Sequence, residues 1–450
     1  MERIQKNFRR NAGLLAGWYQ QACSATSVVM LVPLINRVLG AETSGLWLGL
    51  QGIVLVMSLA DFGFCYLLSR QAAFVNGGGR VAGVATDVDP SVRSWEDIRF
   101  YLLRIKAYNR WGSSIGMLVL AGLLFVFALN ARSDTIPLSL LLETGAILSL
   151  GALLNLLAKP DIAMLEGAGR YVFVRVLLGT QYLLATIVML LMLWVWPDIR
   201  GLALGSLTAS VFAMRVARRH CTRFLKTIKA PASPSPTEAG QSIFRKALPL
   251  GLVQLSAYIV SSLQVPVVAM FFDTKQVAPF FFVHRMAQFS AIAITQMVLA
   301  QLPGFSSELG GGRYDHADAR VRRACKSLAL VGLLPSLAVM CLAPLVLPSL
   351  FPGQELSQFL FIIMAIELYL SLLSSGYGQF VLASGRNPFF LSSIFTAFSS
   401  IGFLYLLHDL GLLSLPLSVL LAGAIAGYWV NFRQGYLLLK RLRSAAESRD

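Results

Sequence analysis

A few charged side chains lie inside long apolar stretches of the chain, and they are the first candidates for chemistry. Arg285, with His284 beside it, lies roughly eight residues into such a stretch, about 12 Å deep at ~1.5 Å per residue. A guanidinium keeps its charge and matches phosphate geometry, and ionisable groups at that depth tend to face a cavity. Arg285 and His284 are therefore candidate ligands of an anionic substrate, although adjacent helical residues diverge by about 100° and need not share one cavity. A snorkelling arginine or a structural ion pair fits the same sequence.

Three acidic residues also lie within apolar stretches. Asp61 is near the end of the second stretch, and Glu143 and Glu367 occupy corresponding places in the fourth and tenth. Each is a candidate proton-binding site or a member of a structural ion pair, and Asp61 is also a candidate cap of a helix end. The His and Cys residues are scattered without metal-ligand spacing, so the sequence predicts no metal site and no cofactor.

Polar residues spaced three and four apart form a stripe on each of two apolar stretches. Such residues share one face of a helix, so both stripes are predicted to line a substrate cavity. Hydrogen bonding between packed helices is the alternative. The stripe residues are Gln20, Ser24 and Ser27 in the first stretch and Gln254, Tyr258, Ser261 and Ser262 in the seventh.

The composition places these residues in a membrane. Of 450 residues, 56% are hydrophobic and only 13% are charged, against about a quarter in soluble proteins. Stretches of about twenty apolar residues recur, each long enough to cross a bilayer. The sequence predicts twelve spans, near residues 12–35, 45–69, 110–129, 136–158, 172–196, 199–217, 247–272, 277–303, 327–350, 356–384, 388–410 and 412–432.

The Lys and Arg residues predict the orientation of these spans. Of 38 such residues, 33 fall on one side of the predicted topology and 4 on the other. By the positive-inside rule both termini face the cytoplasm. The net charge of +16 then reflects topology and contact with anionic membrane lipids, and it does not imply nucleic acid.

A polar, Pro- and Ser-rich segment divides the spans into two groups of six. The sequence predicts an N-terminal six-helix bundle over residues 1–218, a cytoplasmic linker over 219–242 and a C-terminal six-helix bundle over 243–450. Similar turns recur six spans apart, Gly77–Arg80 with Gly310–Arg313 and Ala168–Arg170 with Ser384–Arg386. Because six is even, the two bundles are predicted to be parallel repeats.

Four motifs, in order along the chain, resemble the polysaccharide flippases of the Wzx type. They are Asp61–Phe64 in the second span, Leu165–Arg170 after the fourth, Ala278–Met286 at the start of the eighth and Leu382–Asn387 after the tenth. The resemblance covers essentially the whole chain. It implies the multidrug/oligosaccharidyl-lipid/polysaccharide exporter superfamily, an all-α integral membrane fold whose two bundles form a V around a central cavity.

This resemblance implies that the chain flips an undecaprenyl-pyrophosphate-linked oligosaccharide, a surface-polysaccharide repeat unit such as O-antigen, from the cytoplasmic to the periplasmic leaflet of a bacterial inner membrane. A polysaccharide polymerase and glycosyltransferases of the same pathway are the implied partners. The nearest alternative is a cation-coupled multidrug antiporter of the superfamily, which usually carries a carboxylate deep in its first or seventh helix. A membrane polysaccharide polymerase and a non-transporting scaffold are further alternatives; the short outer joins, without a set of catalytic residues, disfavour an enzyme.

Overall fold

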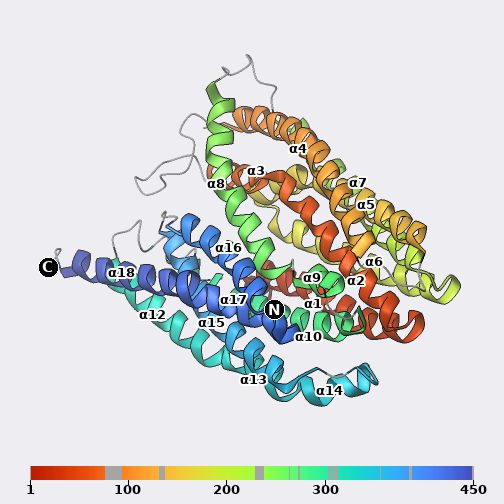
Figure 1. The fold of residues 1–450 in the computed structure, drawn as a ribbon. Helices are drawn as coiled ribbons and strands as arrows, with labels where there is room; N and C mark the ends of the chain where they lie inside the picture. Colours follow the sequence, from red (N-terminus) through yellow and green to blue (C-terminus); the bar gives the residue numbers. More distant parts are fainter. Residues whose placement is uncertain are drawn as a thin grey trace. The chain divides into compact units, whose positions relative to one another are not determined.

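The computed structural model describes residues 2–76, 94–130, 137–228, 238–262, 264–271, 274–299, 301–302, 305, 308, 313–354, 356–384 and 388–447. The regular elements of these residues are all helices (Figure 1). They divide into two compact units. Unit 1 contains the described chain up to Tyr258 and the segment Val265–Ala278. Unit 2 contains Ile259–Gln264 and the chain from Pro279 onward.

The first six predicted spans correspond to seven α-helices of unit 1, because the second span is interrupted. The helices are α1 (Glu2–Leu39), α2 (Ala41–Val54), the 3-10 helix η1 (Leu55–Asp61), α3 (Phe64–Asn76), α4 (Trp95–Asn130), α5 (Leu138–Gly167), α6 (Tyr171–Val195) and α7 (Ile199–Lys226). They are followed by α8 (Glu238–Ser261), α9 (Gln264–Phe271) and η2 (Thr274–Gln276).

Unit 2 carries the remaining described helices. They are α10 (Val277–Leu299), whose first residues belong to unit 1, α12 (Tyr314–Val331), α13 (Leu333–Cys341), α14 (Ala343–Leu350), α15 (Gln358–Ala383), α16 (Phe390–Leu406), η3 (His408–Leu413), α17 (Ser414–Ala422), the π-helical turn η4 (Gly423–Gly427) and α18 (Tyr428–Glu447). Within this unit α12, α15 and α18 pack against one another.

Ten helical segments of the described residues are long and apolar enough to cross a membrane. Two shorter apolar helices, Gly251–Val260 and Phe390–Leu406, fall in the predicted seventh and eleventh spans. Together they match the twelve predicted spans, six before and six after the predicted linker. Many large apolar side chains remain exposed, such as Trp194 and Leu118, as expected where lipid rather than water surrounds the helices.

Unit 1 is held together by a buried cluster at the predicted cytoplasmic ends of its helices. Leu68 of α3, Leu102 of α4, Met164 of α5, Val174 of α6 and Cys221 of α7 are all buried in it. Helices converge this closely because small residues lie at their contacts: a Cβ on Gly112 would lie 2.3 Å from the Ala60 carbonyl oxygen. The cluster therefore fixes the helix ends that carry most of the charged side chains.

The fold differs from the sequence prediction around two joins. Helix α4 begins at Trp95, well before the predicted span, because Ser94 and Asp97 form a reciprocal cap: Asp97 N–H donates to Ser94 Oγ (3.2 Å) and Ser94 N–H to Asp97 Oδ2 (3.0 Å). Helix α7 extends to Lys226, inside the predicted linker. By packing, α8 up to Tyr258 belongs to unit 1, although the sequence assigns it to the C-terminal bundle.

Several predicted features fall outside the described residues. They are the turns at Gly77–Arg80, Gly310–Gly312 and Gly385–Asn387, and the Pro- and Ser-rich core of the linker. The internal duplication, which depends on them, stays a prediction.

Candidate functional site

The Asp61–Phe64 motif interrupts the second span and forms an ion pair with α5. Phe62 adopts a left-handed backbone conformation (φ 45°), as does Gly63 (φ 78°), and such a conformation in an aromatic residue ends a helix. Asp61 Oδ1 accepts the Gly63 N–H (2.7 Å), and Oδ2 lies 3.2 Å from Lys159 Nζ. Asp61 thus both caps the break and pairs across helices, two of the three roles that the sequence left open.

Gln20 of the first polar stripe contacts a basic residue at the start of the predicted fifth span (172–196). Arg175 of α6 donates from Nη1 to Gln20 Oε1 (3.2 Å) and from Nη2 to Glu166 Oε1 (2.7 Å). Its guanidinium also lies over the Tyr171 ring, 4.5 Å from the centroid. The side chain of Arg175 is 28% exposed. Ser24 and Ser27, further along the same stripe, are half-buried.

Three neutral side chains near the middles of α5, α6 and α7 form a chain of hydrogen bonds. Gln181 Nε2 donates to Asn155 Oδ1 (2.9 Å), and Asn155 Nδ2 donates to Ser210 Oγ (3.0 Å). Sequence reasoning missed this network. The available signal was Gln181, an amide in the middle of an apolar span, because a buried amide requires hydrogen-bond partners.

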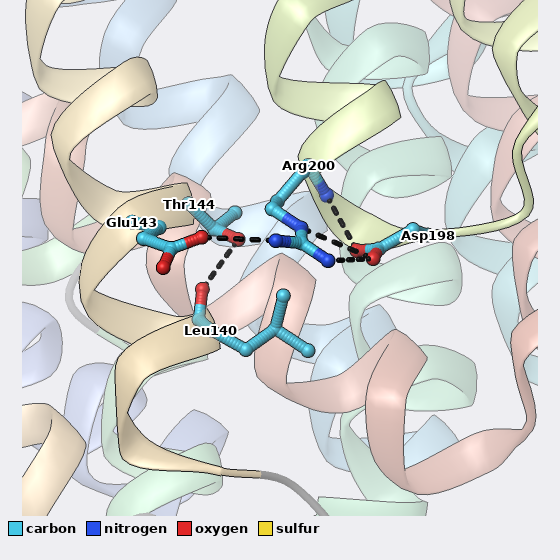
Figure 2. A network of polar contacts seen from close by, with 5 residues as sticks. All are labelled: Leu140, Glu143, Thr144, Asp198 and Arg200. Atoms are coloured by element: carbon cyan, nitrogen blue, oxygen red, sulfur yellow. Dashed lines mark hydrogen bonds and ion pairs between the residues drawn. The ribbon is translucent and has the colours of Figure 1, made fainter.

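Glu143 lies at the opposite end of unit 1 from Arg175 and is part of an ion-pair network (Figure 2). Arg200, in the first turn of α7, bridges Glu143 Oε2 (3.0 Å) and Asp198 Oδ2 (2.9 Å). The Glu143 side chain is 54% exposed. Asp198 also caps α7 by accepting the Arg200 N–H. Glu143 is therefore engaged in joining α5 to the start of α7.

Glu367 of α15 has a different kind of partner. The Tyr428 hydroxyl donates to its Oε1 over 3.4 Å, and no basic side chain forms an ion pair with it among the described residues. Tyr428 follows the π-helical turn η4, and a Cβ on Gly423 would lie 2.5 Å from the Tyr428 ring. Gly423 therefore makes room for the tyrosine that faces Glu367.

His284 and Arg285 share a partner in unit 2. Gln288 Nε2 lies 2.9 Å from His284 Nε2, and Arg285 Nη1 donates to Gln288 Oε1 (2.9 Å). The His284 ring stacks on Phe280, while the Arg285 guanidinium lies over Phe281. The two side chains are thus connected through one amide, although their backbone positions differ by about 100° around α10.

One residue of the second polar stripe, Tyr258, holds two helices together. Tyr258 is buried and donates its hydroxyl to the Gly52 carbonyl oxygen (3.0 Å), which ties α8 to α2. Gln254 and Ser262 are half-buried, and the Ser261 side chain lies outside the described residues. Tyr258 therefore supports the alternative explanation of this stripe, hydrogen bonding between packed helices.

One acidic residue outside the spans is strongly paired. Arg320 forms a two-pronged ion pair with Glu308, and this guanidinium holds the pKa of the Glu308 carboxyl below its ordinary value. Within the described residues no group of three or more His, Cys, Asp or Glu side chains could hold a metal ion.

Solved structures share this architecture across nearly the whole chain. A structure of MATE in the bent conformation matches with a TM-score of 0.66 and 15% sequence identity, and the match covers 97% of each chain. An inward-facing multidrug resistance MATE family transporter of the MOP superfamily matches with a TM-score of 0.66 and 16% identity, over 95% of this chain and 99% of that chain. The chain has the MATE fold.

A MOP superfamily transporter from Pyrococcus furiosus, described as having a binding pocket of reverse polarity that suggests a different function, matches with a TM-score of 0.61 and 17% identity over 96% of both chains. No protein-family model matches the chain, and no curated protein matches its sequence. The MATE fold confirms the predicted all-α integral membrane architecture, and two of the solved proteins that share it are described as transporters.

Proposed function

We propose that the protein is an alternating-access transporter that flips an undecaprenyl-pyrophosphate-linked oligosaccharide from the cytoplasmic to the periplasmic leaflet of a bacterial inner membrane. The observation that carries the proposal is the neutral hydrogen-bond network near the middles of three helices of unit 1. Near the middles of α5, α6 and α7 the polar network consists of two amides and a hydroxyl. Such groups donate and accept hydrogen bonds as sugar hydroxyls require, without the charge that would attract a cation.

The acidic residues of unit 1 strengthen this argument. The sequence has no acidic residue between Glu2 and Glu42, so the membrane portion of α1 carries none. Asp61, Asp161 and Glu166 each lie within ion-pair distance of a basic side chain. A carboxylate already neutralised by Lys or Arg is poorly suited to bind a cationic drug, because the drug would have to displace the resident cation.

A cation-coupled multidrug antiporter is the second candidate, and the comparisons favour it. The MATE structure solved in the inward-facing state is described as a multidrug resistance transporter. Within this chain, Glu367 is the residue that fits that function best, because it faces a tyrosine hydroxyl rather than a basic side chain. An antiporter needs such a carboxyl to exchange a proton or another cation.

Transport in reconstituted vesicles distinguishes the two candidates. The full chain is placed in liposomes with a fluorescent undecaprenyl-pyrophosphate oligosaccharide, and translocation is measured by loss of fluorescence to a membrane-impermeant quencher. The same liposomes are tested for uptake of a cationic dye under a proton gradient. We expect the glycolipid to cross and the dye to stay outside.

Dye uptake without glycolipid translocation would refute the flippase proposal and favour the antiporter. In cells, a deletion strain without a paralogue should accumulate linked repeat units on the cytoplasmic leaflet. Normal surface polysaccharide in that strain would contradict the proposal as well.

A further inference from the structure

Arg175 has hydrogen-bonding capacity that the protein does not use. Its Nη1 and Nη2 each have one acceptor, Gln20 and Glu166. Its Nε is buried and has no hydrogen-bond partner. A buried donor without an acceptor costs free energy comparable to a lost hydrogen bond, so its retention requires an explanation.

The unused donor lies on the edge of the guanidinium that recognises two-oxygen acceptors. Nε and Nη2 form one edge of the arginine fork, and Glu166 occupies that edge through a single oxygen at Nη2. An anion that presents two oxygens to this edge would satisfy both donors. Glu166 therefore holds Arg175 in place but does not make the two-oxygen contact with both Nε and Nη2.

The fold builds this arrangement from a motif that the sequence analysis singled out. After α5, Gly169 adopts a positive φ (78°), and the Arg170 N–H donates to the Leu165 carbonyl (3.0 Å), which reverses the chain directly into α6. The turn places Glu166, at the end of α5, against Arg175, in the second turn of α6. The Leu165–Arg170 turn thus positions both members of the pair.

Glycines on α1 and α6 bring Gln20 to the same point. A Cβ on Gly179 would lie 2.5 Å from the Tyr19 ring, so α6 approaches α1 closely there. Gly17 similarly faces the Tyr171 hydroxyl. Gln20 accepts from Arg175 through Oε1, which leaves its Nε2 hydrogens available as further donors to an anion beside the guanidinium.

We propose that Arg175 and Gln20 bind a phosphate group of the substrate at the predicted cytoplasmic end of unit 1, with Glu166 as a resident competitor that the phosphate displaces. The inference rests on the proposed function, because it names the substrate group that unit 1 recognises first. A pyrophosphate carries more negative charge than one carboxylate and offers several oxygens, so it competes effectively for the fork edge.

Binding of sodium pyrophosphate to the purified full-length protein in detergent tests the site without requiring transport. Titration calorimetry is carried out at constant ionic strength, with sodium sulfate as the comparison anion. We expect Arg175→Gln to weaken pyrophosphate binding at least about tenfold and Arg175→Lys to weaken it less, because an ammonium retains the charge but lacks the fork. Glu166→Gln should tighten binding several-fold, because it removes the competitor.

The opposite effects expected of Arg175→Gln and Glu166→Gln on pyrophosphate affinity distinguish a binding role of Arg175 from a purely structural one. If the Arg175–Glu166 pair only holds α5 to α6, both glutamine variants should weaken binding or stability alike, and that result would overturn the proposal. The matched control is Arg200→Gln, which also removes an arginine from an ion pair of unit 1 but at the other end. It should leave pyrophosphate affinity unchanged.

Two further measurements identify the source of the phosphate and test the phosphate site independently of the proposed function. Nanodiscs containing phosphatidylglycerol should compete weakly; strong competition through Arg175 would assign it to ordinary lipid headgroups and overturn the proposal. Wild-type pyrophosphate binding without glycolipid translocation would keep the site and refute the flippase. Unimpaired translocation and pyrophosphate binding by Arg175→Gln would keep the flippase and refute the site.

Discussion

Three acidic side chains of unit 1 and Glu367 of unit 2 have different kinds of partner, although Glu308 and Asp318 of unit 2 are paired with arginines. In unit 1, Asp61, Asp161 and Glu166 lie within 2.5 to 3.2 Å of a lysine or arginine nitrogen. In unit 2, Glu367 lies within a span and faces a neutral hydroxyl. Glu143 and Glu367 were predicted to correspond, yet the first is an exposed ion-pair partner and the second is not.

This difference indicates a division of labour. Ion pairs inside unit 1 fix helices to one another, and near the middles of α5, α6 and α7 the polar groups are instead two amides and a hydroxyl. A carboxyl without a basic partner is instead able to gain and lose a proton as its surroundings change. Under the proposed function, unit 1 binds the polar headgroup and Glu367 of unit 2 responds to cations.

The largest expected effect is at the ion pair that holds the helix break of unit 1. Asp61→Asn keeps the shape of the side chain but removes its charge, so Lys159 loses its ion-pair partner and keeps its hydrogen bond to the Ser58 carbonyl. Breaking such a pair costs about 3 kcal/mol, reduced here because the Lys159 side chain is 34% exposed. Thermal unfolding of the purified protein should show a clearly lower midpoint for Asp61→Asn than for wild type.

The double variant Asp61→Asn/Lys159→Met provides the control for this prediction. It removes both charges, so it should be less destabilised than the sum of the two single variants. Additive losses would show that the two side chains act independently and that the pair does not organise the helix break.

A smaller effect is expected at Glu367. Tyr428→Phe deletes the hydroxyl that contacts Glu367 and should cost about 1 kcal/mol, the usual value of one hydrogen bond. Glu367→Gln should change stability little, because no ion pair is lost. If Glu367 couples transport to protons, the glutamine variant should also transport at a rate that no longer depends on an imposed proton gradient. If transport by Glu367→Gln still depends fully on the proton gradient, Glu367 is not the coupling group and the proposed difference in function between the units is wrong.

Much of the fold follows from the sequence, because long apolar stretches and basic joins leave few alternatives. The positions of single charges were harder to predict. Arg175 lies at the start of the predicted fifth span (172–196), and the sequence did not single it out as a candidate. Its significance depends on Gln20, which is 155 residues away in sequence.

The polar stripes also show what sequence periodicity cannot predict. Periodicity places residues on a face but does not say what the face contacts. Gln20 meets a guanidinium, whereas Tyr258 donates to a backbone carbonyl of α2. The Asp61–Phe64 motif, in contrast, was informative locally: a carboxylate before Phe-Gly produced both a backbone cap and a helix break.

The smallest expected effect is at Glu143, and it tests whether the corresponding acids of the two units differ in function. Glu143→Gln removes one of two carboxylates around Arg200 and leaves Asp198 in place (Figure 2). Because the pair is exposed, its loss should change the midpoint of thermal unfolding little, and the response of transport to a proton gradient should be unchanged. Measured beside Glu367→Gln in the same vesicles, this variant is the matched control, since both substitutions remove one carboxylate charge. If Glu143→Gln abolishes gradient dependence and Glu367→Gln does not, the coupling group lies in unit 1 and the division of labour between the units is reversed.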